Sequence, residues 1–134
     1  MGEMFDNYPQ PNDYIPDNRH RCIKHNELTI MAGESSSHSF DVPFNVEEQM
    51  SNFSVIYKLG LKVVVVKEQH ELEVVYDEEH NKTIITCDLN PMETALFRDT
   101  LLTAQVQLKF ITKEINEVSY SEIYTIKLLD SLEV

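Results

Sequence analysis

The chain of 134 residues has no tryptophan, only three glycines and only two cysteines. Three glycines are too few for the glycine-rich loops that hold phosphates, and the G-x-x-x-x-G-K-[ST], G-x-G-x-x-G and G-x-S-x-G patterns are all missing. The sequence therefore lacks the motifs of nucleotide-binding proteins and of serine hydrolases. Without tryptophan it also lacks the Cys–Trp–Cys signature of antibody domains.

Basic side chains are scarce, since 11 lysines and arginines stand against 23 aspartates and glutamates, for a formal net charge of −12 at pH 7. Such a charge is repelled by nucleic-acid phosphates and by anionic membranes. The longest apolar run of valines, at 63–66, is far shorter than the ~20 residues of a membrane span. The N-terminus shows no basic-then-apolar secretion signal. We expect no nucleic-acid partner, no membrane association and synthesis in the cytoplasm.

The cysteines and histidines are the first candidates for metal or redox chemistry. Cys22 and Cys87 belong to a chain expected in the reducing cytoplasm, so we expect free thiols instead of a disulfide. His20, Cys22 and His25 fall within six residues, but their spacing matches no standard zinc pattern. We therefore expect no metal at this segment.

Two further clusters could carry chemistry. The acidic segment YDEEH at 76–80 lacks the alternating oxygen ligands and the glycine of a calcium loop, which favours a solvated turn. The serines at 35–37 precede His38, but adjacent residues on a loop lack the third, orienting group of a catalytic triad. From these patterns we expect no catalytic residue, no metal and no cofactor.

Short segments of alternating apolar and polar residues recur from residue 27 onward. The clearest is AQVQLKFI at 104–111, in which every second residue is apolar, as in a half-buried antiparallel strand. Gly60 predicts a turn or bend between two valine-rich strands. The other expected strands are 28–31, 38–44, 54–59, 61–67, 72–76, 84–89 and 118–129. We consider 36–44, which contains Pro43, and the first strand as edges that could pair with another chain.

A short helix is expected after the strand at 84–89. Asn90 can cap it, Pro91 suits its first position, and Glu93 completes a capping box. Seven or eight short strands with one short helix predict an all-β domain, namely an immunoglobulin-like antiparallel β-sandwich, with a small barrel as the alternative. We assign residues 27–134 to this domain and residues 1–26 to an extended N-terminal arm.

The arm contains MFDNYPQPNDYIPDNRHR at residues 4–21. Its prolines prevent a continuous helix and cannot donate to a central sheet, so we expect an extended, polyproline-like segment. Isolated apolar side chains in such a segment suit shallow pockets on a partner. The expected partner-binding residues are Phe5, Tyr8, Tyr14 and Ile15.

The segments KTIITCDLNPMETALF, TAQVQLKF and VSYSEIYTIKLLDSL, in this order, resemble small structural proteins of tailed-phage and prophage morphogenesis modules. VIYKLGLKVVVVKE matches the same group's strand–glycine–strand element, and the resemblance covers residues 27–133. In fold alone it is also similar to the N-terminal immunoglobulin-like domains of phage baseplate upper proteins. The resemblance implies a non-enzymatic virion protein of tail, baseplate or head, made in the host bacterial cytoplasm, that binds other virion proteins and copies of itself. It carries over no catalytic residue.

Two other functions stay open at this stage. A carbohydrate- or ligand-binding sandwich displayed on the particle would stack exposed tyrosines, such as Tyr57, Tyr120 or Tyr124, on a glycan. The core or cross-strand role of these tyrosines is favoured, because tyrosine is common in strands. A small hydrolase is the third function and is disfavoured, because no nucleophile, base and orienting group can be assembled from motifs.

Overall fold

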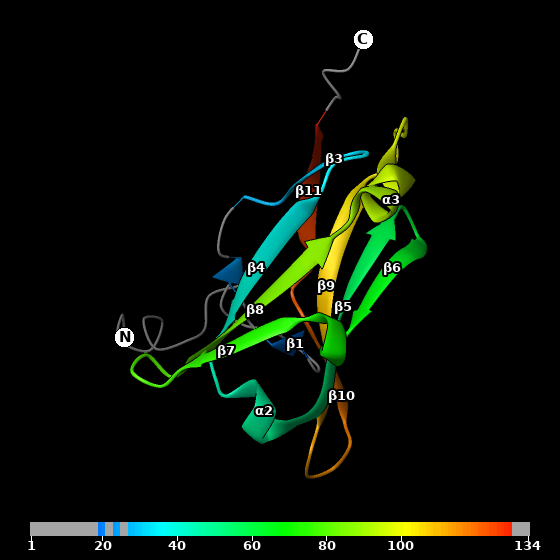
Figure 1. Ribbon diagram of the computed structural model, residues 1–134. Helices are drawn as coiled ribbons and strands as arrows, with labels where there is room; N and C mark the ends of the chain where they lie inside the picture. Colours follow the sequence, from blue (N-terminus) through cyan, green and yellow to red (C-terminus); the bar gives the residue numbers. More distant parts are fainter. Residues whose placement is uncertain (1–18, 21–22, 25–26, 130–134) are drawn as a thin grey trace, which may run out of the picture.

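The computed structural model describes residues 19–20, 23–24 and 27–129. They form two β-sheets packed face to face (Figure 1). The smaller sheet has the strand order β2-β4-β8-β7, and its pairs are all antiparallel. Its strands are β2 (Ile23–Lys24), β4 (Ser36–Val42), β8 (Lys82–Leu89) and β7 (Glu73–Asp77).

The larger sheet has seven strands and is centred on β9 (Ala104–Thr112). On one side β9 pairs with β5 (Met50–Leu59), and β6 (Lys62–Glu68) lies beyond it at the edge. On its other side β9 pairs first with β11 (Tyr124–Leu129) and then with β10 (Val118–Ser121). Two short strands run parallel to these: β3 (Thr29–Met31) beside β11, and β1 (Arg19–His20) beside β10.

The strand orders match the immunoglobulin sandwich. β2-β4-β8-β7 corresponds to the sheet A-B-E-D, and β11-β9-β5-β6 corresponds to G-F-C-C′. The predicted immunoglobulin-like β-sandwich is therefore confirmed. The inter-sheet disulfide of antibody domains has no counterpart here, because strands β4 and β9 contain no cysteine.

Three details differ from the expected strand pattern. The strand expected over 118–129 is interrupted at 122–123, which produces β10 and β11. β1 and β2 lie inside the range assigned to the arm; β1 adds to the larger sheet and β2 to the smaller one. The expectation that 36–44 forms an exposed edge is wrong, because β4 lies between β2 and β8, and Pro43 instead follows the end of the strand at Val42. The first expected strand, β3, does lie at an edge, as predicted. The edges of the four-stranded sheet are β2 and β7, and β6 is an edge of the larger sheet.

Short helices close the two ends of the sandwich. At one end, α3 (Pro91–Thr94) continues into η2 (Ala95–Phe97), as expected. The predicted capping box is present, since Asn90 Oδ1 accepts from the Glu93 backbone N–H at 2.8 Å and the Glu93 carboxylate accepts from the Asn90 N–H at 2.9 Å. α2 (Val46–Gln49), capped by Asn45, and η1 (Gln69–Glu71) were not expected, because single turns are too short to show a helical periodicity.

The core lies between the sheets and follows the alternation of the strands. Ala104, Val106, Leu108 and Phe110 of β9 are all at most 2% exposed, as predicted. Across the sandwich, Phe40 packs on Tyr124 with ring centroids 5.7 Å apart. Gly60 makes the expected turn between β5 and β6 with a φ of 65°, and its N–H donates to the Thr103 carbonyl at 2.8 Å.

We expect Leu108→Ala to destabilise the domain by about 2–5 kcal/mol, because the leucine is buried between the sheets and its truncation leaves a cavity. Leu61→Ala is the matched control, because Leu61 is fully exposed and its truncation changes stability by less than about 0.5 kcal/mol. Urea unfolding followed by circular dichroism measures both. Equal effects of the two substitutions would contradict this core.

Candidate functional site

The expected partner-binding residues Phe5, Tyr8, Tyr14 and Ile15 lie outside the described residues, and so do Cys22 and His25. The structure therefore leaves the arm hypothesis as a prediction. The remaining candidates lie in residues 27–129. Within that part of the chain, no group of three or more His, Cys, Asp or Glu side chains is arranged to hold a metal ion.

His38 is buried in the core and does not pair with the preceding serines. Its Nε2–H donates to the Thr29 carbonyl at 2.8 Å, which leaves Nδ1 to accept from the Tyr57 hydroxyl at 2.7 Å. The Cys87 thiol in turn hydrogen-bonds to Tyr57. One chain of hydrogen bonds thus joins β3, β4, β5 and β8. The sequence did signal part of it, since His38 alternates in phase with Phe40 and Val42.

All three ionisable groups of this chain are held neutral. Burial lowers the pKa of His38, and burial raises the pKa of Tyr57 well above its ordinary value. Burial also raises the pKa of Cys87 to about 11, so the thiolate is not populated at neutral pH. The arrangement suits the structural connection of two sheets, because each polar atom has a partner and none carries a charge.

A buried ion pair lies near the same end of the core. Lys67 on edge strand β6 points inward, is only 8% exposed, and its Nζ lies 2.8 Å from a Glu93 carboxylate oxygen. Burial opposes the charge of Lys67, but the hydrogen bond and charge of Glu93 outweigh it and raise the lysine pKa. A register shift between Tyr57 and Lys58 adds a bulge to the β5–β6 pairing. An inward charge and a bulge are the features by which edge strands resist pairing with other chains.

The acidic segment at 76–80 is a self-contained turn between β7 and β8. Asp77 accepts hydrogen bonds from the His80 ring at 2.8 Å and from the His80 backbone N–H at 3.3 Å. The His80 hydrogen bond lowers the pKa of Asp77. Tyr76 donates to Asn81, whose φ of 48° completes the turn. This agrees with the solvated turn that the sequence favours.

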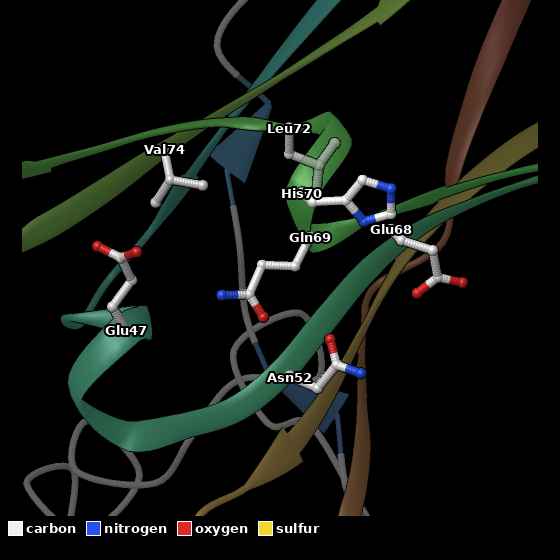
Figure 2. A pocket seen from close by; sticks show the side chains of 7 residues that line it. All are labelled: Glu47, Asn52, Glu68, Gln69, His70, Leu72 and Val74. Atoms are coloured by element: carbon white, nitrogen blue, oxygen red, sulfur yellow. The ribbon is translucent and has the colours of Figure 1, made fainter.

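An open groove lies between α2 and η1 at the side of the sandwich (Figure 2). Gln69 extends from η1 toward the α2 side, where Glu47 lies, and Leu72 and Val74 border the opposite side (Figure 2). Its described lining residues include two carboxylates and one ring, the imidazole of His70, but no tyrosine or phenylalanine. The groove therefore lacks the tyrosine or phenylalanine surface on which a sugar would stack.

The three tyrosines considered for glycan stacking are dispersed. Tyr57 is completely buried, and Tyr124 is half-buried against Phe40. Tyr120 is 36% exposed on β10. These positions do not provide the paired exposed tyrosines that the carbohydrate-binding alternative requires.

The outer face of the seven-stranded sheet displays apolar side chains interspersed with polar ones. Strand register places them between the buried residues of each strand, pointing away from the core. Five of them are more than a third exposed: Val63, Val66, Tyr120, Ile123 and Leu129. A shallow hollow on this face is lined by residues that include Ile56, Lys58, Gln105, Gln107 and Ile123. We call this surface the G-F-C-C′ face.

Charge is divided unequally between the two outer faces. On the G-F-C-C′ face the strands present Lys58, Lys109, Lys127 and a single carboxylate, Glu68. None of these lysines forms an ion pair with a residue in the described part of the chain. The outer face of the four-stranded sheet has the opposite balance, and its strands present Asp41, Glu73, Asp77, Asp88 and Lys82. Sequence alternation shows which residues point outward but not which sheet they share.

A second exposed apolar group lies at the end of the sandwich near α3. Leu61 and Leu101 are fully exposed, and Leu102 is 56% exposed. Leu102 lies against Gly60, so the β5–β6 turn and the segment before β9 meet there. Neighbouring Met92, on α3, is 82% exposed. These side chains add an apolar rim at one end of the domain.

No protein-family model matches the chain, and no curated protein matches it in sequence. Among the described residues, no helix is both long and apolar enough to span a membrane.

His38 makes a prediction for the pH dependence of stability. The folded protein keeps His38 neutral because burial lowers its pKa, whereas the unfolded chain protonates it near 6.5. Below that pH the unfolded state binds more protons, so the free energy of unfolding falls with a slope approaching about 1.4 kcal/mol per pH unit. The loss continues until the pH reaches the lowered pKa of the folded state.

His38→Gln should remove this contribution, because glutamine can donate and accept hydrogen bonds but does not titrate in this range. Urea unfolding at pH 7.5, 6.5 and 5.5 measures the slope. His70→Gln is the matched control, because His70 is exposed and its loss should leave the slope as in the unmodified protein. An unchanged slope in His38→Gln would refute the role of His38.

Proposed function

We propose that this protein is a non-enzymatic structural component of a bacteriophage particle, where it joins neighbouring subunits in tail, baseplate or head. It is made in the bacterial cytoplasm and then becomes part of the virion. Its partners are other virion proteins and copies of itself. The observation that carries the proposal is the G-F-C-C′ face, on which exposed apolar side chains lie among lysines that form no ion pair with any described residue.

The size of this face suits a protein interface. The seven-stranded sheet is five strands wide, because β10 and β11 lie along the same side of β9, and at about 4.8 Å per strand its width is roughly 24 Å. The nine residues of β9, at about 3.4 Å each, give a length of roughly 30 Å and an area of about 700 Å². A standard interface buries about 800 Å² on each partner. Exposed apolar side chains gathered on one face of this extent support a binding site for another macromolecule.

The edge strands of the sandwich disfavour pairing with a strand of another subunit, so contact through a sheet face is the favoured way to join subunits. β6 carries the inward Lys67 and a bulge, both of which oppose pairing with another strand. On the four-stranded sheet, the edge strand β7 presents Glu73 and Asp77 outward. Residues 27–133 resemble phage structural proteins, and this resemblance supports a particle as the setting. The carbohydrate-binding alternative draws less support, because the tyrosines are dispersed and the described lining of the groove near η1 contains no tyrosine or phenylalanine.

Mass spectrometry of particles purified from the bacterial host that carries the gene tests the proposal directly. We expect the protein at a fixed ratio to the other virion proteins. Its consistent absence from purified particles would end the proposal.

A matched pair of variants tests the face. Val66→Asp places a charge on the G-F-C-C′ face, where Val66 is 41% exposed, and Val75→Asp makes the same change on the outer face of the four-stranded sheet, where Val75 is 52% exposed. Both valines lie on edge strands. We expect Val66→Asp to lower incorporation into particles by roughly tenfold, because a buried unpaired charge is costly at an interface. Val75→Asp should enter normally, and equal incorporation would contradict the use of this face.

A further inference from the structure

We infer that the G-F-C-C′ face of one copy is the docking site for the N-terminal arm, residues 1–18, of a second copy of this chain. The inference rests on the proposed function, because it names the partner and the surface through which copies are joined. Three observations carry it: the charge of the two surfaces, the apolar side chains on each, and the length of the arm.

The charges of the arm and the face are complementary. Residues 1–18 contain Glu3, Asp6, Asp13 and Asp17 and no lysine, arginine or histidine. The face offers three lysines and one carboxylate at its outward positions. The protein as a whole has a net charge of −12, but this face is basic and apolar. It therefore attracts the carboxylates of an acidic segment and has only one carboxylate to repel them.

The other surfaces of the domain suit the arm less well. The outer face of the four-stranded sheet presents four carboxylates and one lysine, and that lysine, Lys82, is already bonded to Asp41 at 3.2 Å. The groove between α2 and η1 is lined by Glu47 and Glu68. An acidic arm would meet like charges at both places, which disfavours binding there.

The apolar side chains of the arm suit the shape of the face. Phe5, Tyr8, Tyr14 and Ile15 are separated by polar residues and prolines, so an extended arm presents them singly. The hollow bordered by Ile56 and Ile123 provides a shallow apolar site, and the Lys58 ammonium and the Gln105 and Gln107 amides around it can bond to the arm backbone.

The length of the arm is sufficient to reach a neighbouring copy. The arm joins the sheet at β1, which is parallel to β10, with Arg19 opposite Tyr120. An extended segment of 18 residues spans about 55 Å at about 3.1 Å per residue, nearly twice the ~30 Å length of β9. The arm is long enough to leave its own domain and cross the face of a neighbour.

Photo-crosslinking of the full chain tests the inference. A benzoylphenylalanine at position 14 (Tyr14→benzoylphenylalanine) is introduced into unlabelled protein, which is mixed with an equal amount of ¹⁵N-labelled protein and irradiated. We expect crosslinks between differently labelled chains that map to outward residues of β5, β9 and β11. Crosslinks only within one chain, or to the four-stranded sheet, would overturn the inference.

Charge variants make the test specific. The double variant Lys58→Glu, Lys109→Glu should lower the yield of crosslinks between chains by roughly tenfold, because attraction to the arm becomes repulsion. Lys113→Glu is the matched control, because Lys113 is exposed outside the face, in the β9–β10 turn, and the yield should stay unchanged. Adding Asp13→Lys and Asp17→Lys to the double variant should restore the crosslink. An equal loss with Lys113→Glu, or no restoration, would count against the docking.

The outcomes separate this inference from the proposed function. If the protein is present in particles but the arm crosslinks to a different protein or surface, the docking of arm on face fails and the structural role stands. If chains crosslink as expected but purified particles lack the protein, the docking stands and the phage role fails.

Discussion

Burial of one side of each sheet against the other is the constraint on which the rest of this molecule depends. Extended strands point alternate side chains to opposite faces, so burying Val106, Leu108 and Phe110 necessarily turns Gln105, Gln107 and Lys109 outward. A shift of register by one residue would exchange the two sets and expose the core. The composition of the outer faces, and with it the binding behaviour of the protein, is therefore tied to the packing of the inner ones.

The chain of hydrogen bonds from Thr29 through His38 and Tyr57 to Cys87 constrains how the two packed sheets are positioned relative to each other. Apolar contacts alone tolerate small displacements of one sheet over the other, whereas buried hydrogen bonds require their partners at fixed positions. Removing the His38 or the Tyr57 side chain leaves a buried polar group without its partner, which costs about 1–3 kcal/mol. The network thus favours one relative placement of β3, β4, β5 and β8. Its consequence is that the free energy of unfolding declines in acid, because the folded protein keeps His38 uncharged while the unfolded chain protonates it.

The surface combines features that prevent association with features that invite it. The ion pair of Lys67 with Glu93 and the bulge beside Tyr57 protect the edge at β6 from indiscriminate strand pairing. The G-F-C-C′ face instead leaves valines and isoleucines exposed, with lysines that lack partners in the described part of the chain. In the assembly that we propose, blocked edges leave the face as the preferred route by which subunits join.

The sequence by itself determined the features that depend on residues close together along the chain. The alternation at 104–111, the turn at Gly60 and the capping box of Asn90 and Glu93 each involve residues a few positions apart, and each is present as predicted. Only the tertiary structure decided that β4 lies inside its sheet, that the strand after 118 is interrupted, and that His38 meets Tyr57 across 19 positions. Only it placed three lysines on one outer face and most of the outward strand carboxylates on the other. These features depend on which strands pair and in which register, and pairing is set by the joint packing of distant segments, which no local pattern encodes.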